Sequence, residues 1–307
     1  MKNKVTNLLM SHLLIVATLT SLSSCKKDFS ASPASQSIST TNLVSVTTPL
    51  GVALNGYANS STDSVYVLYS GDKTLFRDEI PGSVLPASIQ QYQTDNYQDY
   101  SQINSFTLID IKGTVKSYLS IIRFNERPVA LEFSTEGNLL KVLEQREKAD
   151  LNNAGWHTGG LFENRDGSNR DNIDIATLPV DINDYFVNNY PQDIITRAFK
   201  TKEDAIVVLS KNNGVLANIF NKNLQWVKHI DLQISNYQID ELEKSSVSPE
   251  TLSVLSAMFP NYVFECASAL SENGANMGSL VCINANNTHY AITLDNIGNI
   301  ISHKTIF

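Results

Sequence analysis

The histidines are the side chains best suited to acid–base or metal chemistry near neutral pH. His12 lies in an N-terminal apolar run, and the other four, His157, His229, His289 and His303, are widely separated. No His-Glu-x-x-His motif occurs, and no carboxylate stands at metal-ligand spacing from a histidine. We therefore expect no metal site and no catalytic base, and interpret these histidines as ordinary surface or strand residues.

Other catalytic patterns are missing from the sequence. It contains no Gly-x-Ser-x-Gly elbow, no phosphate-binding glycine loop and no Gly-x-Gly-x-x-Gly fingerprint. The segment 164–174 superficially resembles an EF-hand calcium loop, but its frame puts Phe162 and Ile173 where oxygen ligands are required. We expect no catalytic residue, no cofactor and no metal, and a chain that is not an enzyme.

Two cysteines could form a disulfide bond. Cys266 and Cys282 flank a predicted turn at 271–278, whose centre lies midway between them. They could be cross-strand neighbours, although a register slip of one residue would put them on opposite faces. A disulfide and a pair of buried thiols both remain open.

The third cysteine, Cys25, follows a stretch with the layout of a secretory signal peptide. Lys2 and Lys4 precede an apolar run that is too short to stay in a bilayer. Leu-Ser-Ser-Cys at 22–25 resembles a bacterial lipobox, which implies that Cys25 is lipidated; the alternative is an ordinary signal peptide with an incidental cysteine. Lys26 resembles the second residue of lipoproteins sorted to an outer membrane, so we expect an exported, lipid-anchored protein on its periplasmic or cell-surface face.

The segment after Cys25 reads as a flexible tether. Residues 29–46 are rich in Ser and Thr and have few large apolar groups, so they cannot bury enough surface to offset ordering entropy. Loss of Lys2 and Lys4 with the leader changes the net charge from −8 to −10. An acidic chain without a basic stripe is a poor candidate for binding nucleic acid. No second apolar segment is long enough to span a membrane, so the lipid would be the only membrane attachment.

The chain repeats one pattern. The segments 85–97 and 178–190 both open with Leu-Pro, carry Ile and Tyr at the same offsets and close with Asn-Tyr, and 247–259 is a fainter copy. Each predicts a short amphipathic helix with proline in or next to its first turn.

Strand-like runs separated by turns follow each predicted helix. In the second copy they cover 194–200, 205–210, 214–220 and 224–232. Alternation of apolar and polar residues predicts antiparallel sheets with a covered face, and the order of a helix followed by strands predicts an α+β fold.

These residues resemble the β-lactamase-inhibitor-like, PepSY-like domains of bacterial lipoproteins. The match is good over 178–231, nearly as good over 85–144, and weakest over 247–307. The resemblance implies tandem units, each with one short helix packed on a four-stranded antiparallel sheet. It implies no established activity, and no residue of an inhibitory loop is carried over.

The predicted organisation has six parts. They are a signal peptide (1–24), a lipidated Cys and tether (25–46), a first unit with an N-terminal strand extension (47–148), a polar linker (149–177), a second unit (178–233) and a divergent third unit (234–307). The long linker is expected to separate the first unit from a block formed by the other two.

The favoured function is a non-enzymatic module that binds a protein or peptide, with an inhibitor-like role as one form of it. Two alternatives remain: a glycan- or peptide-capture lipoprotein for nutrient uptake, and a structural envelope component. Glycan capture would call on Trp156 or Trp226, the only tryptophans, although packing is the expected role of Trp226.

Overall fold

The computed structural model describes residues 43–47, 64–68, 75–125, 127–151, 156–157, 160–162, 172–201, 203–232, 234 and 237–307. The expected signal peptide, Cys25 and most of the tether lie outside these residues, as does most of the calcium-loop-like segment. Among the described residues, no helix is long and apolar enough to cross a bilayer.

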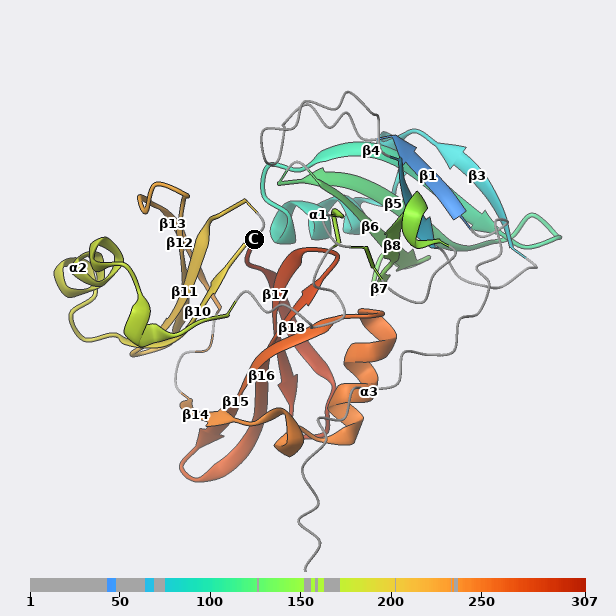
Figure 1. Cartoon of the computed structure of the whole chain (residues 1–307). Coiled ribbons are helices and arrows are strands. Elements are labelled where there is room, and N and C mark those ends of the chain that lie inside the picture. Colours follow the sequence, from blue (N-terminus) through green and yellow to red (C-terminus); the bar gives the residue numbers. More distant parts are fainter. Residues whose placement is uncertain are drawn as a thin grey trace, which may run out of the picture.

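Three units of one kind follow each other along the chain (Figure 1). Unit 1 consists of β3 (Phe76–Ile80), α1 (Ala87–Asn96), β4 (Ser101–Ile109), β5 (Val115–Phe124), β6 (Arg127–Ser134) and β7 (Leu139–Val142). Unit 2 consists of β9 (Asn172–Ile173), α2 (Val180–Asn189), β10 (Ile194–Lys200), β11 (Ile206–Lys211), β12 (Val215–Phe220) and β13 (Trp226–Asp231). Unit 3 consists of β14 (Gln238–Leu242), α3 (Pro249–Met258), β15 (Val263–Glu272), β16 (Ala275–Ala285), β17 (Thr288–Asp295) and β18 (Ile300–Thr305). In addition, β1 (Leu43–Thr47), β2 (Ser64–Leu68) and β8 (Glu144–Glu147) form a small antiparallel sheet.

The predicted helices are confirmed at all three positions. Pro86 and Pro179 stand at the N-caps of α1 and α2. In α3 the proline occupies the first turn, and the hydroxyl of Ser248 accepts a hydrogen bond from the Thr251 backbone N–H. The helices stop where Tyr97, Tyr190 and Phe259 leave helical geometry.

The prediction of four-stranded sheets is wrong by one strand. Each unit has a five-stranded antiparallel sheet, because a strand before the helix pairs with the first strand after it. These extra strands are β3, β9 and β14. They lie at sheet edges and are either very short or almost fully exposed, so they carry too few buried apolar residues to show the alternation expected of a strand with one covered face.

The units do not pack in the order of the sequence. The helix-covered faces of units 1 and 3 share one apolar core, which includes Ile89, Tyr97, Leu255 and Tyr290. The opposite face of the unit 3 sheet packs on unit 2 through a second core. Unit 3 therefore lies between the other two, and the linker does not isolate unit 1.

The junction of units 1 and 3 is reciprocal. Helix α1 lies against β18 of unit 3, and α3 lies against β7 of unit 1. The Tyr92 hydroxyl lies 2.8 Å from Nδ1 of His303, and the Tyr97 hydroxyl lies 3.3 Å from that of Tyr290. Units 1 and 3 therefore contact each other through the helix and the last, edge strand of each unit.

Candidate functional site

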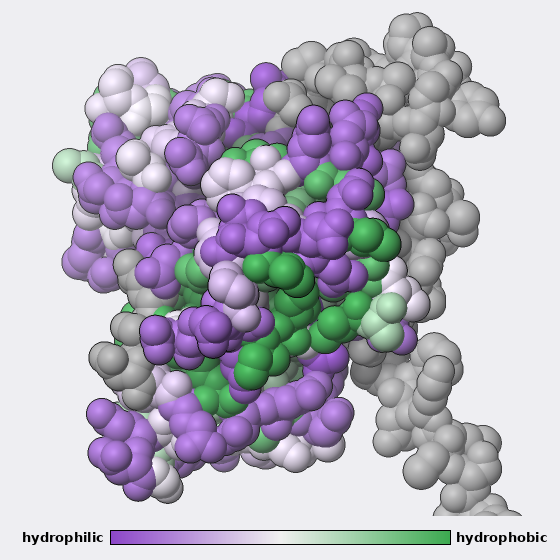
Figure 2. Space-filling model, turned by 90° about the vertical axis from the view of Figure 1, so that its left-hand side faces the viewer, coloured by the Kyte–Doolittle hydropathy of each residue, from purple (hydrophilic) through white to green (hydrophobic). Residues whose placement is uncertain are grey.

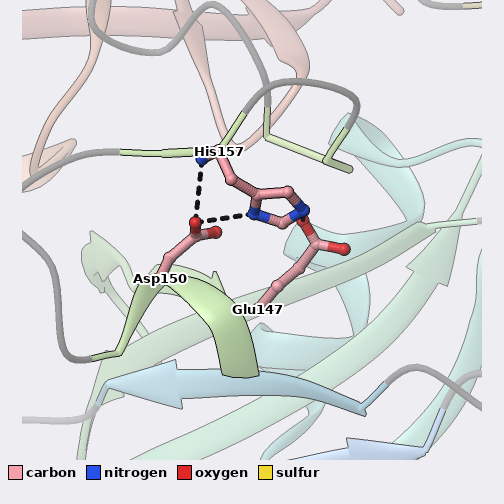
Figure 3. Close-up of side chains that lie close together, drawn as sticks. All are labelled: Glu147, Asp150 and His157. Carbon is pink, nitrogen blue, oxygen red and sulfur yellow. Dashed lines mark hydrogen bonds and ion pairs between the residues drawn. The ribbon is translucent and has the colours of Figure 1, made fainter.

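The structure brings together one histidine and two carboxylates that the sequence keeps apart. Glu147 ends β8, Asp150 lies in the short 3₁₀ turn η3 (Lys148–Asp150), and His157 returns over both (Figure 3). Oδ1 of Asp150 accepts hydrogen bonds from the backbone N–H of His157, at 2.9 Å, and lies 2.8 Å from its Nδ1. Oε2 of Glu147 lies 3.7 Å from Nε2 of His157 and accepts a hydrogen bond from the Leu161 N–H.

This cluster has the donor types of a divalent-cation site. One ligand atom from each of the three residues lies within 4.8 Å of the others, and an imidazole with two carboxylates suits Zn²⁺ or Mn²⁺. Asp150 is buried and its Oδ2 has no hydrogen-bond partner among the residues that the structure describes, whereas the His157 side chain is 42% exposed. However, the contacts in place hold His157 and Leu161 against the end of β8 and the turn after it, so the cluster already has a structural role without a metal.

A hollow lies between units 2 and 3. It is a groove of about 290 Å³, lined by β10 and β11 on one side and by β14 and β15 on the other. Leu209, Cys266 and Leu280 form a buried floor. At the rim, Ile194 is 62% exposed and Ile175 is partly exposed. Figure 2, which views the side on which unit 2 lies in Figure 1, shows hydrophobic surface gathered in a band across the middle of this face.

The polar groups of this groove are paired with each other. Arg197 and Glu241 form an ion pair across the two units, and Nζ of Lys211 donates a hydrogen bond to the Ile239 carbonyl at 2.6 Å. The residues that line the groove include no histidine, and its one carboxylate is well exposed. Such an arrangement suits binding of an apolar segment better than proton transfer.

Both predicted disulfide candidates lie at this junction. Cys266 and Cys282 are paired in the register of β15 and β16, and both belong to the core between units 2 and 3. Their side chains therefore share one face, and the structure has them as buried free thiols. The neighbouring Cys266 and burial raise the pKa of the Cys282 thiol well above its usual value, so it stays protonated and unreactive at neutral pH.

The other histidines have structural environments. His289 is buried, stacks on Phe199, and its Nδ1 lies 2.8 Å from Oε1 of Glu265. Burial, with a smaller contribution from Lys304, lowers the pKa of His303 to about 4. His229 is exposed on β13 and lies beside the Tyr190 hydroxyl.

Trp226 is partly exposed and partly packed. Its indole stacks on Tyr185 with ring centroids 5.8 Å apart, and its Nε1 donates a hydrogen bond to Oδ1 of Asn218. The side chain is still 40% exposed, so packing uses one face of the ring and leaves the rest accessible. Trp156 is near the cation-binding candidate, where the Arg146 guanidinium lies over its ring.

No family model matches this chain, and no curated protein matches it. One similar solved structure is described as a periplasmic protein of the DUF2874 family from Bacteroides vulgatus, with 15% identity over 52% of this chain and 99% of that chain, and a TM-score of 0.18. A second is described as a calcium-regulated periplasmic protein from Bacteroides thetaiotaomicron, with 16% identity over 50% and 96% and a TM-score of 0.19. A third, a periplasmic protein of unknown function from Bacteroides vulgatus, has 11% identity over 51% and 100% and a TM-score of 0.19. Identities and TM-scores this low assign no function to the chain.

Sequence reasoning missed both the cation-binding candidate and the groove. Glu147, Asp150 and His157 have no regular spacing, and a turn rather than a helix or strand brings them together. The groove is formed by strands from two units whose contact no local pattern indicates. The one sequence signal for the groove was Ile194, an isoleucine at the start of a predicted strand. Its side chain is exposed in the structure.

Proposed function

We propose that this chain is a lipid-anchored envelope protein whose PepSY-like, β-lactamase-inhibitor-like units bind another protein and catalyse no reaction. The signal peptide and Cys25 support the location, and the repeated helix-and-sheet pattern supports the family. The groove between units 2 and 3 is the observation that carries the binding role.

The groove fits a protein segment in size and in chemistry. Its floor is aliphatic, and exposed isoleucines at the rim would gain by being covered. The Arg197–Glu241 pair offers charged hydrogen-bonding groups beside this apolar floor, the mixture found where an interface core meets its polar rim. An apolar side chain inserted from a partner would occupy the volume, and backbone polar groups of the same segment could bond at the rim.

A pair of matched variants tests this role. Ile194→Lys puts a charge at the groove rim, and Ile301→Lys puts the same charge at an exposed isoleucine of β18 outside the groove lining. We expect saturable binding of a protein from envelope extracts to weaken about tenfold in Ile194→Lys and to stay unchanged in Ile301→Lys.

Two results would contradict the proposal. One is that the unmodified chain retains no saturable protein partner. The other is that both variants bind it as well as the unmodified chain.

Glycan capture is a second candidate because Trp226 offers an exposed indole stacked on a tyrosine. Tryptophan fluorescence that stays unchanged across a panel of oligosaccharides would remove it.

A further inference from the structure

The three units allow their surfaces to be compared position by position. The turn before the last strand aligns them, because Ser134, Asn221 and Asp295 each accept backbone hydrogen bonds two and four residues further on. The helix ends at Tyr97, Tyr190 and Phe259 align them a second time. Every position of the helix and last strand of unit 2 therefore has a counterpart in units 1 and 3.

Five positions of unit 2 are more exposed than both of their counterparts. Tyr190 is partly exposed, whereas Tyr97 and Phe259 are fully buried. The other four, Asn189, Trp226, His229 and Asp231, are exposed. Their counterparts are buried or half-buried: Asn96 and Met258, Leu139 and Ile300, Val142 and His303, and Glu144 and Thr305.

Other positions of the same two elements show no such difference. Val187 is exposed, and so are its counterparts Thr94 and Ser256. Val227 is exposed, and so are Leu140 and Ile301. The extra exposure is thus confined to the surface that units 1 and 3 turn toward each other.

An aromatic pair of unit 2 has the same geometry as the equivalent pair of unit 1, which lies in the junction of units 1 and 3. Tyr92 packs edge-on against Phe133 with centroids 5.3 Å apart, and Tyr185 packs on Phe220 at the same distance. Tyr92 goes on to reach His303 of unit 3. The corresponding histidine of unit 2, His229, contacts Tyr190 and Trp226 of its own unit and is otherwise exposed. Helix α2 lies at the outer side of the molecule (Figure 1).

We propose that the surface formed by α2 and β13 binds a second copy of this chain, in the way that units 1 and 3 bind each other. The internal junction joins a helix of each unit to the edge strand of the other. The unit 2 surface carries both a helix and an edge strand. In two copies related by a two-fold axis, the helix of each copy therefore lies against the edge strand of the other. Tyr185 of one copy then approaches His229 of the other, and the tryptophans are covered, as the enrichment of aromatic residues in interfaces favours. This inference does not depend on the groove between units 2 and 3.

The test is sedimentation of the chain from residue 26 onward, which keeps every described residue, over a range of concentrations. We expect a monomer–dimer equilibrium with a roughly micromolar dissociation constant, because the surface is small and mixed in polarity. Asn189→Arg places a charge inside the surface, and Val187→Arg places the same charge on the same helix outside it. Trp226→Lys and Val227→Lys form the equivalent pair on β13.

The expected result is that Asn189→Arg and Trp226→Lys weaken dimerisation about tenfold or more, while their two controls stay within about twofold. In a Trp156→Phe background, Trp226 emission shifts to shorter wavelength as the dimer forms. A chain that is monomeric throughout, or a dimer that all four variants leave intact, overturns the proposal. So does a monomer whose Trp226 emission saturates with an oligosaccharide, which would assign the surface to glycans. Ile194→Lys separates the two proposals. We expect this variant to bind the protein partner in the groove more weakly and to sediment like the unmodified chain.

Discussion

The surface of unit 2 formed by α2 and β13 is built from a helix and a last strand, as is the junction of units 1 and 3. In the junction these elements are covered by another unit, whereas on unit 2 several of the equivalent side chains are exposed. In the junction, Tyr97, Phe259 and Tyr290 are fully buried, and two tyrosine hydroxyls meet across the units. On unit 2 the helix ends at Tyr190, the counterpart of Tyr97 and Phe259, and His229 takes the position of His303; these two side chains are hydrogen-bonded to each other and reach solvent. One unit design therefore gives a permanent internal contact in one place and an accessible aromatic surface in another, where Trp226 and His229 replace aliphatic residues such as Leu139 and Val142.

The largest difference is expected from removing the aromatic ring that ends each helix. Tyr97→Ala leaves a cavity in the core of the junction and a buried Tyr290 hydroxyl without its partner, so we expect the free energy of unfolding to fall by about 3–5 kcal/mol. Tyr190→Ala removes a partly exposed ring and should cost about 1 kcal/mol. Urea denaturation of dilute protein measures both. Equal losses would mean that the two surfaces are equally packed in solution.

The second difference concerns pH. Burial among Tyr92, Phe259 and Tyr290 lowers the pKa of His303 to about 4, below its value of about 6.5 in an unfolded chain. Because the unfolded chain binds the proton more readily, His303 makes the fold less stable as pH falls through this window. Its contribution is a loss of about 2 kcal/mol between pH 7 and pH 5.

Replacing His303 with phenylalanine should remove this part of the pH dependence. Ile301→Phe, at an exposed position of the same strand that carries no titratable group, is the control, and we expect it to leave the pH dependence as it is. Stability measured by urea denaturation at several pH values tests the pair. A His303→Phe profile that parallels the unmodified one would show that His303 is solvated in the fold.

The smallest difference lies at the helix starts. Ser248 caps α3 through its hydroxyl, whereas α2 starts at Pro179 with no side-chain hydrogen bond. Ser248→Ala should cost about 1 kcal/mol, and Ser253→Ala, an exposed position inside the same helix, should stay within about 0.5 kcal/mol. Thermal or urea unfolding of the two variants decides it, and equal effects would show that the cap contributes nothing.

Local features of this fold could be predicted from the sequence, but contacts between units could not. Proline in or next to the first turn and the aromatic residue at the end marked all three helices, and alternation marked the inner strands. The two-residue strand β9 is too short to show a pattern. Apolar residues such as Ile89 and Leu255 indicate that a face is covered, but not whether its own sheet or another unit covers it. The same limit hid the groove, which depends on strands of two units. The histidine–carboxylate cluster was hidden for another reason, because its three residues are close in sequence but have no regular spacing.

The central place of unit 3 has a consequence for biogenesis. Units 1 and 2 both precede it along the chain, so each emerges from the ribosome before the surface that will cover it exists. Transiently exposed hydrophobic surface favours aggregation. Folding of this chain should therefore call for holding chaperones until the last strands arrive, and C-terminal shortening should harm the earlier units as much as the unit it removes.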